Sequence, residues 1–214
     1  MVDSERFRLF IAVAIPEAVK AKMAEAQAEL RRALPGHGVR WTRREQFHLT
    51  LKFLGDVDAA RVEALGEAIR AACRGFGVLH LRAERVGFFP DLRYPRVVWT
   101  GVLDQAERLT RLQQAVDIAT RAFTTEQKEE RFTGHVTLAR IKAIRRPEAE
   151  ALGKAAAAMA DRVFGHWTTG QVELMRSVLS PKGASHNALA EMALADLPLG
   201  LAGPPPRAWQ AAQH

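Results

Sequence analysis

The stretch HLTL at residues 48–51 has a counterpart in HVTL at residues 135–138, and in both a histidine and a threonine alternate with two aliphatic residues. Alternate side chains of a β-strand point to opposite faces. Each of these tetrads therefore predicts a strand with one polar face, formed by His and Thr, and one apolar face that packs in the core. Two such strands side by side present two imidazoles and two hydroxyls to one small anion, a set that suits acid-base chemistry on a phosphodiester.

The segments around the tetrads alternate between a two-residue and a helical hydrophobic period. The expected strands cover residues 7–14, 47–54, 78–88, 96–102, 134–142, 171–179 and 187–194, and the expected helices cover 17–34, 58–74, 104–123 and 148–160. In each half a tetrad strand is followed by a helix and then by strands. The simplest arrangement is a duplicated, two-lobed α+β fold in which the tetrad strands face each other across a cleft.

Composition limits the class of protein further. A length of 214 residues with 48% hydrophobic residues is ample for a packed core. We expect one bilobal domain over residues 1–195 and an exposed or partly disordered extension, rich in proline, over 196–214.

Cys73 cannot form an intramolecular disulfide because it is the one cysteine, and its place in an apolar stripe indicates a buried thiol. With no signal peptide and no apolar run long enough to span a bilayer, we expect a cytoplasmic protein that does not bind membranes.

The formal net charge of +7 comes mostly from arginine, whose guanidinium group binds phosphate in bidentate fashion. A polyanionic partner such as RNA is therefore plausible, although genome bias also enriches arginine. Motifs for other chemistries are absent from the sequence: it contains neither a Gly-rich phosphate loop, nor an H-E-x-x-H zinc motif, nor a G-x-S-x-G nucleophile elbow. We therefore expect no metal and no cofactor. One alternative stays open, in which both histidines are half-buried structural residues bonded to their neighbouring threonines.

Several further side chains are candidates for binding a substrate. Strand alternation puts Lys52 on the face of His48 and Thr50, within reach of the phosphate or at the cleft edge. Arg131, four residues before His135, can cap the cleft and contact the phosphate, or belong to the solvated loop. The same alternation puts Arg140 on the wrong face, which favours an ion pair or a surface role for it. Arg93 and Tyr94 lie on a loop where they could stack a base and hold a phosphate, or form an ordinary surface turn.

The tetrads, read as HLTLKFLG at 48–55 and HVTLAR at 135–140, resemble those of the 2H phosphoesterase superfamily. The bacterial and archaeal RNA 2′,3′-cyclic phosphodiesterases, also called 2′-5′ RNA ligases, are the most similar branch. Flanking segments agree with this resemblance: RLFIAVAIP at 8–16, RVVWTGV at 96–102 and SVLSPKGASHNAL at 177–189. The resemblance implies a two-lobed fold with pseudo-twofold symmetry and antiparallel sheets that line a central basic groove, with helices outside.

Residue roles follow from the resemblance by position. His48 would be the general acid that protonates the leaving ribose oxygen, and His135 the general base that activates water. Thr50 and Thr137 would hold the phosphate. The implied reaction is metal-independent hydrolysis of RNA 2′,3′-cyclic phosphate ends to 2′-phosphomonoesters, with possible reversal to ATP-independent 2′-5′ ligation.

The sequence departs from the family pattern at two positions. Gly134 stands where a proline usually precedes the second tetrad, and we expect a looser start of that strand. His186 stands where an aromatic residue, often tyrosine, is common.

Two other functions stay open: a phosphodiesterase for a small non-RNA cyclic nucleotide, and an RNA-binding or repair-associated module with little catalysis. We expect a monomer.

Overall fold

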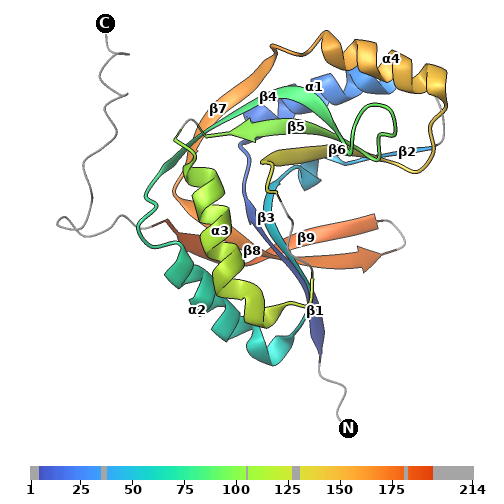
Figure 1. Ribbon diagram of the computed structural model, residues 1–214. Coiled ribbons are helices and arrows are strands. Elements are labelled where there is room, and N and C mark those ends of the chain that lie inside the picture. The colour runs from blue at the N-terminus through green and yellow to red at the C-terminus, as the bar shows by residue number, and fades with distance from the viewer. Residues whose placement is uncertain (1–4, 35–37, 105, 127–130, 181–182, 195–214) are drawn as a thin grey trace, which may run out of the picture.

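The computed structural model describes residues 5–34, 38–104, 106–126, 131–180 and 183–194 (Figure 1). The expected extension at 196–214 lies outside these ranges. The strands are β1 (Arg6–Val13), β2 (Val39–Trp41), β3 (Leu49–Asp58), β4 (Leu79–Phe89), β5 (Val97–Leu103), β6 (His135–Ile141), β7 (Val163–Thr169), β8 (Gln171–Ser180) and β9 (Gly183–Ala193). The α-helices are α1 (Glu17–Ala33), α2 (Val62–Ala72), α3 (Arg108–Thr120) and α4 (Arg146–Ala157), and three 3-10 turns are η1 (Arg44–Gln46), η2 (Ala59–Arg61) and η3 (Arg121–Phe123).

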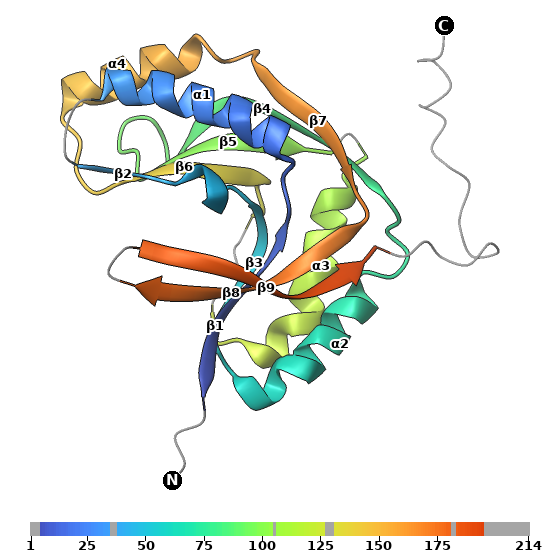
Figure 2. The ribbon, with the colours of Figure 1, turned by 180° about the vertical axis from the view of Figure 1, so that it is seen from behind.

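Two antiparallel sheets make up the molecule. One has the strand order β3-β1-β8-β9 and the other β2-β6-β5-β4-β7, so each sheet contains one tetrad segment. The helices α2 and α3 cover the outer side of the first sheet, and α1 and α4 cover that of the second (Figures 1 and 2). The expected α+β fold with two sheets and outer helices is thus confirmed. No helix in the described part of the chain combines the length and apolarity that crossing a membrane requires.

The core explains why these segments adopt these elements. Residues 9–13 of β1 are all buried because this strand lies between β3 and β8 and is covered on both faces. The helix α1 buries Val19, Met23, Ala26 and Leu30, the spacing that places side chains on one helical face. Cys73 at the end of α2 is buried, and burial raises the pKa of its thiol to about 11, as expected for a packing residue.

The expected strands and helices are all present, and two strands were not expected. The strand β2 has three residues and pairs only with β6 at the edge of its sheet. The strand β7 pairs with β4, and the pairing shifts register beside Gly165, which has a φ of 156°. Neither segment carries the long alternating pattern that predicts a strand from sequence.

Both tetrads contain a β-bulge at the same place. The pairing of β1 with β3 goes from Ala12–Thr50 to Ile11–Lys52 and skips Leu51. The pairing of β5 with β6 goes from Trp99–Thr137 to Val98–Ala139 and skips Leu138. An extra residue in one strand reverses the alternation of faces beyond it. The residue five positions after each histidine therefore turns to the face that the histidine occupies.

Candidate active site

A cleft of about 1060 Å³ lies between the two sheets, and both tetrads line it. The first sheet contributes Thr50 of β3 and His48, which directly precedes β3. The second contributes His135 and Thr137 from β6. The four side chains that the sequence singles out therefore share one cavity, as the alternating patterns predict.

The backbone two residues before each histidine interacts with its ring. His135 Nδ1 lies 2.7 Å from the Thr133 carbonyl oxygen. Because a carbonyl oxygen only accepts, Nδ1 carries the proton, and the neutral ring then has its lone pair on Nε2. The ring of His48 is likewise bonded to the backbone of Gln46. The same local bond at both tetrads is a second sign of the duplication.

Aromatic rings support both imidazoles. His48 packs on Phe10 with ring centroids 4.8 Å apart, and His186 meets His48 edge-on at 5.4 Å. On the opposite sheet, Phe89 meets His135 edge-on at 5.0 Å, and the indole of Trp99 lies 6.3 Å from that imidazole. These contacts restrict the ring orientations, which is what a pair of acid-base groups needs.

Gly87 makes room for one of these supporting rings. It pairs with Trp99 across β4 and β5, and a Cβ atom at position 87 would overlap the indole, 2.2 Å from its nearest atom. The absence of a side chain at this position lets the indole lie across β4, beside Phe89 at a centroid distance of 5.1 Å. A glycine far from either tetrad in sequence thus positions the ring that neighbours His135.

The environment of His48 disfavours its charged form. Burial, and after it the proximity of His186, lowers the pKa of His48 from 6.5 to about 4, although the bond to Gln46 acts in the opposite direction. Burial and then the charge of Arg43 also lower the pKa of His186. The cleft therefore holds neutral imidazoles near neutral pH on the His48 side, and a bound anion would favour their protonation.

Arginine dominates the charge of the cleft. Of the described residues that line it, the basic side chains besides histidine are Arg8, Arg40, Arg131 and Arg140, against a single acidic one, Glu126. Arg40 and Arg140 are directly opposite each other in the pairing of β2 with β6. Four guanidinium groups around a cavity attract an anionic ligand and suit a phosphate.

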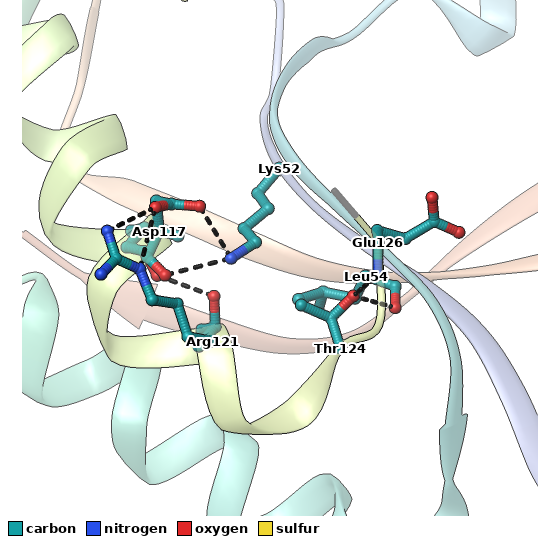
Figure 3. Close-up of polar contacts among 8 residues, drawn as sticks. Lys52, Leu54, Asp117, Arg121, Thr124 and Glu126 are labelled. Atoms are coloured by element: carbon teal, nitrogen blue, oxygen red, sulfur yellow. Dashed lines mark hydrogen bonds and ion pairs between the residues drawn. The ribbon is translucent and has the colours of Figure 1, made fainter. Parts of the chain in front are cut away.

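The structure places two cations contrary to the strand alternation assumed from sequence. Lys52 does not line the cleft: its Nζ lies 2.9 Å from Asp117 Oδ1 and 3.0 Å from the Asp117 carbonyl oxygen (Figure 3). Arg140, which alternation assigns to the other face, lines the cleft. The bulges after Thr50 and Thr137 explain both errors, because they turn Phe53 and Arg140 to the side of the histidines.

The Lys52 contact is a buried ion pair on the far side of β3. The side chains of Lys52 and Asp117 are only 9% and 7% exposed. Burial by itself raises the pKa of the Asp117 carboxyl, but Lys52 and then Arg121 outweigh it and hold this pKa below its usual value. Lys52 thus joins β3 to α3 rather than contacting a substrate.

Residues 124–126, which begin the segment that leads to the second tetrad, contact β3. Thr124 Oγ1 donates to the Leu54 carbonyl oxygen at 2.8 Å and accepts from the Glu126 amide at 2.9 Å (Figure 3). A Cβ atom at Gly55, where φ is 67°, would lie 2.7 Å from Glu126 Oε1. These contacts bring residues 124–126 against the cleft, and Arg131 lines it where the described chain resumes.

The backbone of Gly134 packs closely against that of Val102, whereas the flexibility of glycine predicts a loose start of the strand. Its carbonyl oxygen accepts from the Val102 amide at 2.8 Å. An added Cβ atom would lie 2.5 Å from the Val102 carbonyl oxygen. The expected loosening at the start of β6 is therefore not what the structure shows, and glycine allows the close approach of two backbone segments here.

His186 reaches the cleft from the hairpin of β8 and β9. The Ala184 carbonyl oxygen accepts from Arg43 Nη2 at 3.0 Å and from Gln46 Nε2 at 2.5 Å, which fixes the hairpin beside His48. The residues that line the cleft but were not predicted to contact a substrate are Phe10, Trp41, Phe53, Phe89, Arg140 and His186. Phe53 and Arg140 occupy the same position relative to their histidines, but strand alternation assigns that position to the opposite face, so no sequence signal marked them.

Arg93 and Tyr94 do not line this cleft. They line a second groove, formed by residues 92–96 with residues 141–150. No group of three or more His, Cys, Asp and Glu side chains gathers as a metal site within the described ranges.

The sequence and the fold both have known relatives. Residues 13–99 and 102–184 match the family described as LigT-like phosphoesterase. The RNA 2′,3′-cyclic phosphodiesterase of Methanothermobacter thermautotrophicus is 30% identical over 83% of this chain and 94% of its own length. The protein of the same name from Aeropyrum pernix is 35% identical over 69% of this chain and 82% of its own.

Solved structures have the same fold. The crystal structure of TT0787 of Thermus thermophilus has a TM-score of 0.70 at 28% identity and covers 87% of this chain and 97% of that one. Apo LigT of E. coli has a TM-score of 0.68 at 23% identity and covers 90% and 99%.

Proposed function

Because this chain belongs to the LigT-like phosphoesterase family, we propose that it hydrolyses 2′,3′-cyclic phosphate ends of RNA to 2′-phosphomonoesters without a metal. Relatives at 30% and 35% identity are named RNA 2′,3′-cyclic phosphodiesterase. The observation that carries the proposal is the convergence of both His-Thr pairs on one arginine-lined cleft.

The two histidines divide the proton transfers. Nε2 of neutral His135 takes a proton from a water molecule, whose oxygen attacks the phosphorus as the bond from phosphorus to the ribose O3′ breaks. His48 gives its proton to the departing O3′. One P–O bond forms and one breaks, and solvent returns both imidazoles to their starting states. The same steps with an RNA 5′-hydroxyl in place of water, attacking the 2′,3′-cyclic end as O3′ departs, would give 2′-5′ ligation without ATP.

For His48 to act as the acid, the substrate has to assist its protonation. Its low pKa arises mainly from burial of the charge. A phosphodiester anion beside the ring offsets this cost, since an opposite charge within a few ångströms raises the pKa of an imidazolium. We therefore infer that His48 gains its proton when the anionic substrate occupies the cleft.

The other polar groups stabilise the phosphoryl oxygens. The hydroxyls of Thr50 and Thr137 donate to the non-bridging oxygens, where negative charge increases in the transition state. Arg131 and Arg140, which line the same cavity, provide guanidinium donors for these oxygens. Lys52 has no part in this scheme, because Asp117 holds its ammonium group.

The test is an assay of the purified protein in excess EDTA. An oligoribonucleotide with a 2′,3′-cyclic phosphate end is the substrate, and chromatography separates the product. We expect turnover in the wild type and a loss of roughly 10²-fold or more in His48→Asn and in His135→Asn. His166→Asn, which removes an exposed histidine of β7, is the matched control and should behave as wild type.

Two outcomes would overturn the proposal: no hydrolysis by the wild type in EDTA, or unchanged activity in His135→Asn. Turnover of small cyclic nucleotides but not of oligoribonucleotides would instead indicate a small-molecule phosphodiesterase. Salt-sensitive RNA binding that persists in both histidine variants, without hydrolysis, would indicate a binding module.

A further inference from the structure

A second groove, of about 1000 Å³, lies at one end of the five-stranded sheet. Its walls are the loop between β4 and β5, residues 92–96, and the segment 141–150 that leads from β6 into α4. In Figures 1 and 2 these two segments lie side by side at the same end of the sheet. We call this cavity the outer groove.

Cations and an exposed aromatic ring line the outer groove. Its basic residues are Arg93, Arg96, Lys142, Arg145 and Arg146. Glu148 pairs with Arg145 at 2.9 Å and Glu150 with Arg146 at 3.1 Å. The side-chain cations of Arg93 and Lys142 form no ion pair with any residue that the structure describes. Tyr94 between these groups is 76% exposed.

The backbone fixes Tyr94 in this exposed position. Asp91 Oδ1 accepts from the amides of Arg93 and Tyr94 at 2.7 and 3.1 Å. The Arg96 amide donates to the Phe89 carbonyl oxygen at 2.7 Å, and Pro95 between them is buried. The hydrogen-bonded turn thus holds the ring of Tyr94 toward solvent. Arg93 and Lys142, which form no ion pair with the described residues, lie beside it. An exposed aromatic ring next to such cations is typical of a surface on which a nucleic-acid base stacks.

The outer groove and the catalytic cleft share their strands. Phe89, Val97 and Arg140 line the cleft, and the groove is lined by residues close to them in the chain, such as Arg96 and Ile141. The Ile141 amide donates to the Arg96 carbonyl oxygen at 2.8 Å and joins the two walls. At about 3.3 Å per strand residue, Lys142 lies roughly 23 Å along β6 from His135. A single nucleotide in the cleft cannot span that distance, but an RNA chain can.

We propose that the outer groove binds the single-stranded RNA that precedes the terminal cyclic phosphate. A 2′,3′-cyclic phosphate closes the 3′ end, so the chain can leave the cleft only in the 5′ direction. A base of this segment stacks on Tyr94, and its phosphates contact Arg93 and Lys142. This inference rests on the proposed function and makes oligonucleotides better substrates than mononucleotides.

Two substrates separate the groove from the catalytic cleft. Steady-state kinetics would compare adenosine 2′,3′-cyclic phosphate with a ten-nucleotide RNA that has a 2′,3′-cyclic phosphate end. Loss of one stacked base corresponds to a factor of about ten, so Tyr94→Ala should raise KM for the RNA about tenfold and leave KM for the mononucleotide within twofold. Tyr94→Phe, which keeps the ring, should retain the wild-type KM.

The double variant Arg93→Ala/Lys142→Ala tests the binding of the RNA phosphates. It should lower the dependence of log KM on log salt concentration for the RNA by roughly 0.7 for each phosphate that is no longer neutralised. Arg31→Ala/Arg74→Ala, which removes two exposed arginines outside both cavities, is the control for net charge and should leave that slope unchanged.

Equal effects on both substrates, or no effect on the RNA, would overturn the inference. If the wild type hydrolyses neither substrate, the proposed function fails, and fluorescence anisotropy with a 5′-labelled RNA then decides about the groove. A tenfold weaker binding in Tyr94→Ala would support the groove on its own, and unchanged binding in the groove variants would refute it.

Discussion

Replacing Lys52 with methionine should destabilise the protein without impairing catalysis. The Lys52 ammonium lies 2.9 Å from Asp117 Oδ1 in a pair that is almost entirely buried. Removing one partner of such a pair costs about 3–5 kcal/mol, because the other charge stays buried. Arg121, 3.2 Å from Asp117 Oδ2, remains as a partner, so we expect the lower end of this range. For a chain of this length, about 3 kcal/mol lowers Tm by roughly 6–12 °C.

Thermal unfolding followed by circular dichroism measures the first effect, and steady-state hydrolysis at 25 °C measures the second. KM and kcat of Lys52→Met should stay within twofold of the wild type. Arg140→Met should show the reverse, with an unchanged Tm and a KM about tenfold higher, because it removes a charge-assisted hydrogen bond to the phosphate. Adding Asp117→Leu to Lys52→Met should recover much of the lost stability.

The opposite pattern would show that Lys52 contacts the substrate. If Lys52→Met raised KM about tenfold while Tm stayed unchanged, Lys52 would face the phosphate. The bulge after Thr50 would then not redirect the strand as described.

Three more predictions concern the cleft. The unfolded chain protonates His48 near pH 6.5 and the folded protein only near pH 4, so the free energy of unfolding decreases as the pH is lowered from 6.5 to 4. Urea unfolding should therefore show that the wild type loses about 3 kcal/mol more than His48→Asn over this pH range. Equal losses would contradict burial of a neutral ring. His186→Phe should raise the pKa of His48 in an NMR titration, whereas a lower or unchanged value would contradict repulsion between the rings. Gly134→Ala should cost about 1–3 kcal/mol in urea unfolding, because its Cβ meets the Val102 carbonyl; wild-type stability would show that this backbone yields easily.

Hydrophobic periodicity predicts most elements of this fold because long elements repeat their pattern several times. The helix α1 and the strand β8 fall almost where their periods put them. A short edge strand such as β2 offers no repeat to detect, and Gly165 interrupts the pattern of β7. Both missed strands receive their structure from a neighbour across the sheet, which a local pattern does not record.

For the site, strand alternation predicts side-chain directions correctly only up to the bulges. Alternation places His48 with Thr50 and His135 with Thr137 correctly, because no bulge separates the members of either pair. It fails for Lys52, just beyond the extra residue in β3. A bulge depends on pairing with the neighbouring strand, so one strand's sequence cannot reveal it. Phe53 and Arg140 occupy equivalent positions after the two bulges, and both line the cleft.

In the proposed mechanism, two histidines on opposite sheets act on one phosphate. A single turnover of a 2′,3′-cyclic phosphate-ended RNA in H₂¹⁸O with EDTA, read by ³¹P NMR and mass spectrometry, tests it most directly. We expect a 2′-phosphomonoester with one ¹⁸O atom, and no such product within the same time when either His48 or His135 is asparagine. A 3′-phosphomonoester, or turnover that only one histidine controls, would contradict it.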